Sequence, residues 1–245
     1  MFPISDDNPR RHLTPYVNFT IIGACVLVFL WQATLGEQGS ELAFYRLGMI
    51  PARLLEGKEL QPDFALVPAW ATVFTSMFLH GGWLHLGGNM LYLWIFGDNI
   101  EDSMGHGRYL TFYLLSGVAA ALAQGWTDPS STIPMVGASG AISGVLGAYI
   151  VLHPGATVRV LIFLGFFVTV THIPAVIVLG VWFGLQLLSG LAPSTGEAGV
   201  AFWAHIGGFV AGIALVPFFK RRAVPMLERP RHRAFQMERR RGPWG

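Results

Sequence analysis

Two polar side chains in otherwise apolar stretches of the chain are of types that can act together in catalysis. Ser139 lies in the run GASG, and His205 lies in the run AHIGG. A serine hydroxyl is a poor nucleophile until a base takes its proton, and histidine is the side chain that most often does so. Neither stretch has an Asp or Glu to orient the imidazole. The residues therefore predict a serine–histidine dyad, in which packing and local hydrogen bonds orient His205.

Two further polar residues, His85 and Asn89, are four positions apart and would lie on one face of a helix. Attack of a serine on an amide places negative charge on the carbonyl oxygen, which needs preorganised hydrogen-bond donors. We expect His85, Asn89 and the backbone N–H of Ser139 to supply these donors. Each of these polar residues, taken singly, is more often a packing or structural group, so their conjunction carries the hypothesis.

Two alternatives involve the same part of the sequence. Ser143 is a rival nucleophile one helical turn after Ser139, but it would lie deeper, where water is scarcer. A metal site is the main chemical alternative. His80 and His85 are five positions apart, which suits two ligands on one helix face poorly, and no His-Glu-x-x-His motif occurs. The sequence therefore predicts no metal.

The composition indicates a membrane protein. The chain of 245 residues is 53% hydrophobic and 12% charged, whereas a soluble domain usually carries about 25% charged residues. Stretches of about 20 apolar residues are long enough to cross a bilayer as helices. We expect one all-α, polytopic membrane domain over residues 16–219. The expected spans are Tyr16–Leu35, Leu84–Asn99, Tyr109–Trp126, Gly137–His153, Pro174–Leu191 and Val200–Phe219.

The two ends of the chain indicate how this domain is oriented. The N-terminal segment, residues 1–15, contains Arg10 and Arg11, and the basic tail, residues 220–245, contains nine Lys or Arg residues. Basic residues are retained on the cytoplasmic side, so both ends are expected there and the number of spans is even. The apolar segment Ala156–Val170 is too short for a seventh span and is expected to be interfacial or re-entrant. The tail can also contact lipid headgroups, but it lacks the folded platform of a nucleic-acid-binding site.

Six spans bring the candidate residues to one depth. In that topology the second, fourth and sixth spans all begin at the outer face. The dyad and both oxyanion candidates then lie on the order of 5–10 Å below that face, because a helix rises about 1.5 Å per residue. A seventh span would move His205 to the inner side, away from Ser139. The even span count and the dyad hypothesis therefore support each other.

Glycines next to the dyad allow its two helices to approach closely. Gly140 and Gly144 are four positions apart on the fourth span, and Gly208 and Gly212 are four apart on the sixth. Small residues at this spacing let backbones meet in lipid, although the pattern by itself is common. We assign these four glycines, together with Gly137, to helix packing.

The chain resembles the rhomboid intramembrane serine proteases from Tyr16 to Phe219. The resemblance rests on the pattern HxxxxHxxxN over residues 80–89, on GDNIED over residues 97–102, and on GASG and AHIGG, all in the expected order. It implies a six-helix rhomboid-like bundle with a site open to the outer face. It also implies that the connection 36–68 is a first external loop lying partly in the membrane.

The resemblance also implies roles for individual residues of this chain. It implies that Ser139 is the nucleophile, that His205 is the base, and that no metal or other cofactor is needed. It carries the oxyanion site to His85 and Asn89. Two departures matter: some bacterial members have a Trp-Arg pair in the first external loop, which is missing here, and a Tyr where this chain has Ser143. Another group is therefore needed to orient the histidine.

The function expected from this resemblance is cleavage of transmembrane segments of other membrane proteins near the outer leaflet. The expected location is a prokaryotic inner membrane, with membrane lipid and transmembrane substrates as partners and no nucleic acid. The alternative is a non-catalytic, rhomboid-like binder of membrane clients, but such proteins generally lack the Ser139 and His205 equivalents. A transporter would show inverted repeats, which are not evident. The sequence sets no oligomeric state.

Overall fold

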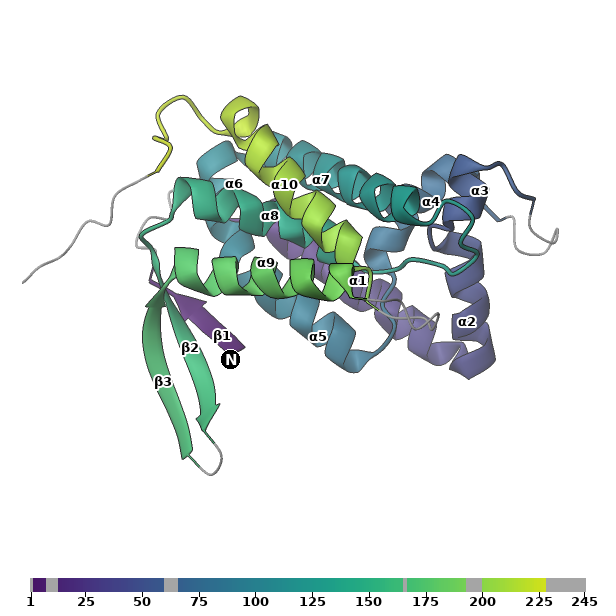
Figure 1. Cartoon of the computed structure of the whole chain (residues 1–245), viewed down its shortest axis with the longest axis horizontal. Coiled ribbons are helices and arrows are strands. Elements are labelled where there is room, and N and C mark those ends of the chain that lie inside the picture. Colours follow the sequence, from purple (N-terminus) through teal and green to yellow (C-terminus); the bar gives the residue numbers. More distant parts are fainter. Residues whose placement is uncertain (1, 8–12, 60–65, 165–166, 193–199, 228–245) are drawn as a thin grey trace, which may run out of the picture.

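The computed structural model describes residues 2–7, 13–59, 66–164, 167–192 and 200–227. These residues form a bundle of helices with a small sheet at one end (Figure 1). The helical elements are α1 (Tyr16–Thr34), α2 (Gly36–Leu47), α3 (Pro51–Leu55), α4 (Ala69–Thr75), η2 (Ser76–Phe78), α5 (Trp83–Tyr92), η3 (Leu93–Gly97), α6 (Asp98–Met104), α7 (His106–Thr127), α8 (Ser139–Leu152), α9 (Ala175–Leu191) and α10 (Phe202–Phe219). The strands are β1 (Phe2–Asp6), β2 (Thr157–Leu164) and β3 (Phe167–Pro174).

The six apolar segments expected to be spans coincide with helical structure. Five of them correspond to α1, α7, α8, α9 and α10, and the second runs through α5, the π-helical turn η3 and the start of α6. By length and composition α1 and α10 can each cross a membrane, whereas α8 and α9 are apolar but shorter. The number of spans therefore stays a prediction.

The connection 36–68 is folded where the structure describes it. Its helices α2 and α3 lie with α4 at the end of the bundle opposite the sheet (Figure 1). Met49 and Met135 exchange two backbone hydrogen bonds, at 3.1 and 2.7 Å. This pairing ties the connection to the segment that leads into α8, and therefore to the surroundings of Ser139.

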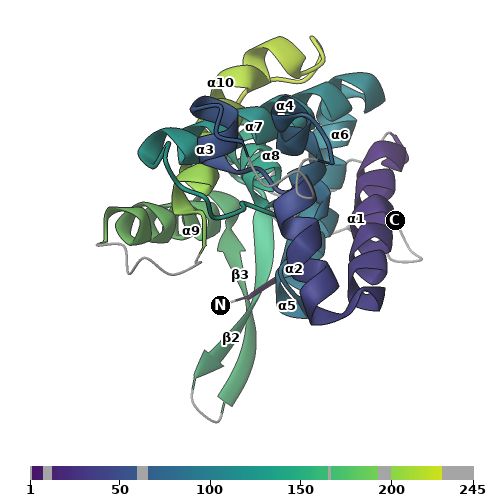
Figure 2. The ribbon, with the colours of Figure 1, turned by 90° about the vertical axis from the view of Figure 1, so that its right-hand side faces the viewer.

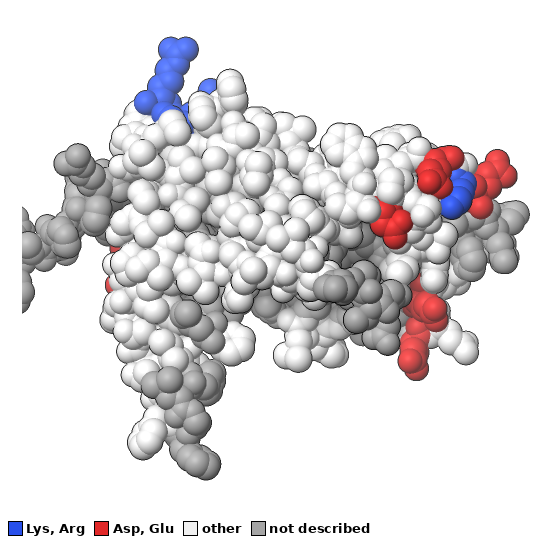
Figure 3. All heavy atoms as spheres, viewed as in Figure 1, with Lys and Arg blue, Asp and Glu red and all other residues white. Residues whose placement is uncertain are grey.

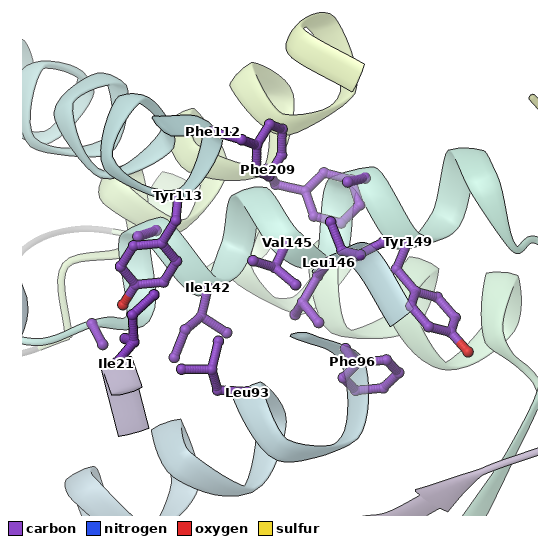
Figure 4. Packing of buried hydrophobic residues seen from close by; sticks show 14 of the residues in the cluster. Ile21, Leu93, Phe96, Phe112, Tyr113, Ile142, Val145, Leu146, Tyr149 and Phe209 are labelled. Carbon is purple, nitrogen blue, oxygen red and sulfur yellow. The ribbon is translucent and has the colours of Figure 1, made fainter. Parts of the chain in front are cut away.

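Helix α8 is the central helix of the bundle. Every residue from Gly140 to Tyr149 is buried, as expected for an apolar helix that has no polar face. Helices α7 and α10 pack along it, and Figure 4 shows Phe112 of α7 and Phe209 of α10 beside Val145 of α8. The core is therefore built around the helix that begins at Ser139.

Glycine brings α8 and its neighbours into backbone contact. A Cβ atom on Gly212 would fall on the carbonyl oxygen of Gly144, and one on Gly208 would fall on the carbonyl oxygen of Gly140. On its other side, Gly144 lies against Ser116 of α7. There is no room for a side chain between α8 and α10, so their axes are held at the shortest separation that helices allow.

The segment Ala156–Val170, which we expected to be interfacial or re-entrant, forms strands. The chain is mostly helical, as an all-α protein should be, but β2 pairs antiparallel with β3, and β1 pairs with the other edge of β2. The physical reason is a run of β-branched residues, such as Val158, Val160 and Val170, which favours strands over helix. The resulting hairpin projects away from the helices in both views (Figure 1, Figure 2).

Strand β1 ties the N-terminal segment, residues 1–15, to the bundle where the structure describes it. The carboxylate of Asp6 accepts hydrogen bonds from Asn99 Nδ2 at 2.7 Å and from the Tyr149 hydroxyl at 2.6 Å. Arg10, Arg11 and the tail beyond residue 227 lie outside the described residues. The orientation argued from these basic residues therefore stays a prediction.

A buried carboxylate at the same end holds the start of α1. Glu101 of α6 is fully buried and accepts the backbone N–H groups of Val17 at 3.0 Å and Asn18 at 2.7 Å. These are among the first N–H groups of α1, which have no partner within the helix. A negative charge there also interacts favourably with the helix dipole.

Charged side chains lie at the two ends of the face drawn in Figure 3. Lys and Arg gather where α10 ends, Asp and Glu dominate the end formed by α2 and α3, and a broad uncharged surface separates them (Figure 3). Exposed side chains of α1, α9 and α10 include Leu27, Leu188 and Phe218. A surface without charged side chains between two charged ends is what a bilayer requires.

Gly212→Ala should destabilise the protein, because the added methyl group would push against the backbone of α8. Overpacking of this kind costs about 1–3 kcal/mol, which should lower the midpoint of thermal unfolding in detergent. Gly23→Ala in α1 is the matched control, because nothing lies within 4 Å of a Cβ atom at Gly23. Equal midpoints for the two variants would show that the contact between α8 and α10 does not require glycine.

Candidate active site

Ser139 and His205 lie at the starts of two helices that touch. Ser139 is the first residue of α8, and His205 lies in the first turn of α10. The Oγ atom of Ser139 lies 2.8 Å from Nε2 of His205, which is a hydrogen-bond distance. A neutral imidazole at this position can take the hydroxyl proton directly. The glycine contacts between α8 and α10 hold the two side chains at this separation.

The other ring nitrogen of His205 contacts a residue that the sequence reasoning missed. Nδ1 of His205 lies 2.8 Å from Oε1 of Gln186 on α9. The ring of Trp182, one turn earlier on α9, lies 5.9 Å from the imidazole between centroids. Gln186 is the sole amide or charged side chain in α9, which reads AVIVLGVWFGLQLLSGL. A single strongly polar residue in so apolar a segment is costly, and it was the signal available in the sequence.

His85 and Asn89 lie one turn apart on α5 and converge on Gly137. A Cβ atom on Gly137 would lie 2.8 Å from Nε2 of His85 and 3.7 Å from Nδ2 of Asn89. His85 Nδ1 accepts the Gly81 N–H at 3.2 Å, so Nε2 carries the ring proton and is a donor. The buried Nδ2 of Asn89 has no partner among the described residues. Two side-chain donors therefore lie together beside the segment that leads to Ser139.

The backbone around Ser139 adds further donors. Helix α8 begins at Ser139, and the first N–H groups of a helix have no partner within it. Gly137 has φ +124°, a conformation that favours glycine, and its N–H donates to the Ser76 carbonyl at 2.9 Å. This turn presents the start of α8 to the side chains of His85 and Asn89. Together they can stabilise negative charge on an oxygen attached to the carbon that the serine attacks.

Ser143 does not share the position of Ser139. Its hydroxyl donates to the Ser139 carbonyl at 2.6 Å, and the residue is buried within the bundle. A hydroxyl that bonds to the backbone four residues earlier is common for serine inside a helix. The arrangement leaves Ser139, which is partly exposed and next to the imidazole, as the candidate nucleophile.

His80 anchors the loop before α5. Its backbone N–H donates to Oε1 of Gln32 on α1 at 3.1 Å, and its ring lies 5.3 Å from the ring of His85. Burial lowers the pKa of His80 to about 4, so the ring is neutral at pH 7. Within the described ranges, no three His, Cys, Asp or Glu side chains are grouped to hold a metal ion. The expectation that no cofactor is needed stays a prediction.

Comparisons with known proteins give one consistent family. The family model of the Rhomboid domain matches residues 68–222, more than half of the chain. The chain is 34% identical over 146 residues to Rhomboid protease GluP of Bacillus subtilis (strain 168), which covers 60% of this chain and 26% of the relative. It is 34% identical over 108 residues to the mitochondrial Rhomboid protein 1 of Saccharomyces cerevisiae (strain ATCC 204508 / S288c). This match covers 42% of this chain and 31% of the relative.

A third relative, Rhomboid protease AarA of Providencia stuartii, is 33% identical over 102 residues, which cover 36% of each chain. The chain thus spans about a quarter to just over a third of the length of these three curated relatives. The range matched by the family model contains all four candidate residues, which are His85, Asn89, Ser139 and His205.

Gly137→Ala should slow the reaction of Ser139 with a fluorophosphonate, because the methyl group would displace His85 and with it the donors. A displacement of this size can cost about tenfold or more in rate. Gly57→Ala is the matched control, because Gly57 also has positive φ (+67°) but nothing lies within 4 Å of its Cβ position. Both variants strain the backbone, so equal labelling rates would show that crowding at Gly137 does not matter.

Proposed function

The chain belongs to the rhomboid family of integral membrane proteins, and from this premise we propose that it is an intramembrane serine endopeptidase. The observation that carries the proposal is the 2.8 Å contact between Ser139 Oγ and His205 Nε2. Two of the relatives that it matches are named as rhomboid proteases. A serine beside an imidazole, with donors on the neighbouring α5, is an arrangement suited to acyl transfer.

The proposed reaction has two halves. Ser139 Oγ attacks the carbonyl carbon of the scissile amide while His205 Nε2 takes the hydroxyl proton. The resulting oxyanion accepts hydrogen bonds from Asn89 Nδ2, His85 Nε2–H and the N–H of Ser139. His205 then gives its proton to the leaving amine, which leaves an acyl group on Ser139. A water molecule, deprotonated by His205, attacks this ester. As the ester bond breaks, His205 returns the proton to Ser139 Oγ and the second product leaves.

The proposed substrates are transmembrane helices of other membrane proteins. Amides in a helix are hydrogen-bonded within it, so cleavage requires local unwinding. We therefore favour substrates with Gly, Ala, Ser or Pro near the outer interface. Entry past α5 and α9 agrees with the many exposed side chains on both helices, such as Leu84 and Leu188. The proposed setting is a prokaryotic inner membrane, with both termini in the cytoplasm.

A non-catalytic binder of membrane clients is the alternative, and no observation favours it. Such a protein has no use for a serine at hydrogen-bond distance from an imidazole. Nor does it need the buried amide donor of Asn89, which has no partner among the described residues. Keeping such a donor unpaired in the bundle costs free energy, which a reaction that generates an oxyanion would recover.

Ser139→Ala and His205→Ala should each reduce cleavage of a transmembrane substrate in liposomes by roughly 10³-fold or more, because they remove the nucleophile and its base. Labelling by a fluorophosphonate should disappear in Ser139→Ala. Ser143→Ala is the matched control, because its hydroxyl contacts the backbone of α8, and it should keep most of its labelling. Full proteolysis by Ser139→Ala would overturn the assignment.

Asn89→Ala should lower kcat for a transmembrane substrate while KM changes little, because the amide would act on the oxyanion and not on the bound substrate. Loss of one such donor typically costs about 10²–10³ in kcat. Steady-state kinetics in detergent measure the two constants separately. An effect confined to KM would instead place Asn89 in substrate binding.

A further inference from the structure

The amide of Gln186 decides which nitrogen of His205 can act as the base. Oε1 of an amide has no proton to donate, so the 2.8 Å contact with Nδ1 requires the ring proton to sit on Nδ1. Nε2 then keeps its lone pair and can accept the hydroxyl proton of Ser139. With the proton on Nε2 instead, the imidazole could not serve as a base for the serine.

Helix α9 supplies two side chains beside the imidazole, Gln186 at Nδ1 and Trp182 with its ring centroid 5.9 Å away. Trp182 and Gln186 are one turn apart, so they project from the same face of α9. On α8, the hydroxyl of Ser143 is bonded to the Ser139 carbonyl and does not orient the ring. The orientation of His205, which lies on α10, thus depends on contacts from a different helix.

The half of α9 that carries Gln186 is less buried than the half that follows the sheet. The buried residues of α9, Ala175, Val178 and Leu179, all lie in its first half. In its second half, Leu185 and Leu188 are exposed. What holds this half is contact with α10, chiefly the stacked rings of Phe183 and Phe209, whose centroids are 4.5 Å apart. A shift of this half would therefore withdraw Gln186 from His205 while the rest of the bundle stays packed.

We propose that Gln186 is a positioning residue for the base, and that it makes the dyad competent only while α9 is docked against α10. Its amide fixes the tautomer and rotation of His205, and thereby takes the part that a carboxylate plays in a triad. The inference rests on the proposed function, because it concerns the reactivity of Ser139. It also links the helix past which a substrate would enter to the reactivity of the site.

The test compares variants of Gln186 by the rate at which a fluorophosphonate labels Ser139, measured from pH 5 to pH 9. Gln186→Leu should label more slowly by about tenfold or more, because the ring is no longer held. Gln186→Glu keeps an acceptor for Nδ1–H and should recover most of that rate. In Gln186→Glu, the fall of the labelling rate on the acid side of the pH profile should move to higher pH, because a carboxylate stabilises the protonated imidazole. His85, a titratable side chain that interacts with His205, is the same in both variants.

The matched control is Gln124→Leu. Oε1 of Gln124 on α7 accepts the backbone N–H of Ala204 at 3.3 Å, so this variant also removes a glutamine contact to α10 but does not touch the imidazole. It should keep the pH profile of the wild type. Thermal midpoints confirm that each variant is folded. Labelling of folded Gln186→Leu at the wild-type rate, or a Gln186→Glu variant as slow as Gln186→Leu, would overturn the inference.

Failure of the inference and failure of the proposed function give different results. If Gln186→Leu is labelled normally while Ser139→Ala is not labelled, the proposed function holds and the role of Gln186 does not. If the wild-type protein is not labelled at all, the proposed function fails and this inference fails with it.

A disulfide can test the part played by docking. A Cβ atom on Gly190 would lie 3.4 Å from the Cβ of Phe202 on α10, close to the separation of about 3.5–4.5 Å that a disulfide needs. In Gly190→Cys/Phe202→Cys, oxidation should maintain or raise the labelling rate. In the double-cysteine variant that also carries Gln186→Leu, oxidation should not restore the labelling rate that the loss of Gln186 lowers. Loss of labelling on oxidation, or its restoration without Gln186, would overturn the proposal.

Discussion

Contact between the backbones of α8 and α10 is the constraint on which the rest of the site depends. Gly144 and Gly212 leave no space between the two helices, so residues near their starts are fixed relative to each other. Ser139 and His205 occupy those positions and lie within one hydrogen bond. In lipid, close packing of this kind supplies much of the attraction between helices. The same glycines therefore contribute to stability and set the distance at which a proton can move.

Much of the candidate site could be predicted because polar residues within the apolar stretches of membrane helices can be recognised in the amino-acid sequence. A polar residue in an apolar run is costly and therefore informative, and Ser139, His205 and Asn89 are of this kind. Their depths follow from the order of the segments and from the rise of a helix. The glycine spacing indicates which faces can meet. Together these rules bring three helices to one place without any knowledge of their packing.

The strands β2 and β3 and the contact made by Gln186 could not be predicted from these rules. The strands around Val158 and Val170 were missed because only the length and apolarity of their segment were weighed, and its alternating β-branched residues were not. Gln186 was missed for a different reason. Helix α9 is apolar on all faces apart from Gln186, and one polar residue does not identify the neighbouring side chain that it contacts. The contact between Gln186 and His205 follows from a rotation that tertiary packing sets.

The β2–β3 hairpin connects the helix of the nucleophile to the helix of Gln186, and its base is fixed. Val158 and Val160 are buried in the core, and Ala175 at the start of α9 is held by a backbone hydrogen bond to Ala156 at 2.8 Å. The end of α9 next to the sheet is therefore fixed, whereas Gln186 lies in the less buried half of the helix. At a rise of about 1.5 Å per residue, Gln186 lies roughly 16 Å along the helix axis from Ala175. A tilt of about 10° would carry its amide some 3 Å from the imidazole, far enough to break a hydrogen bond.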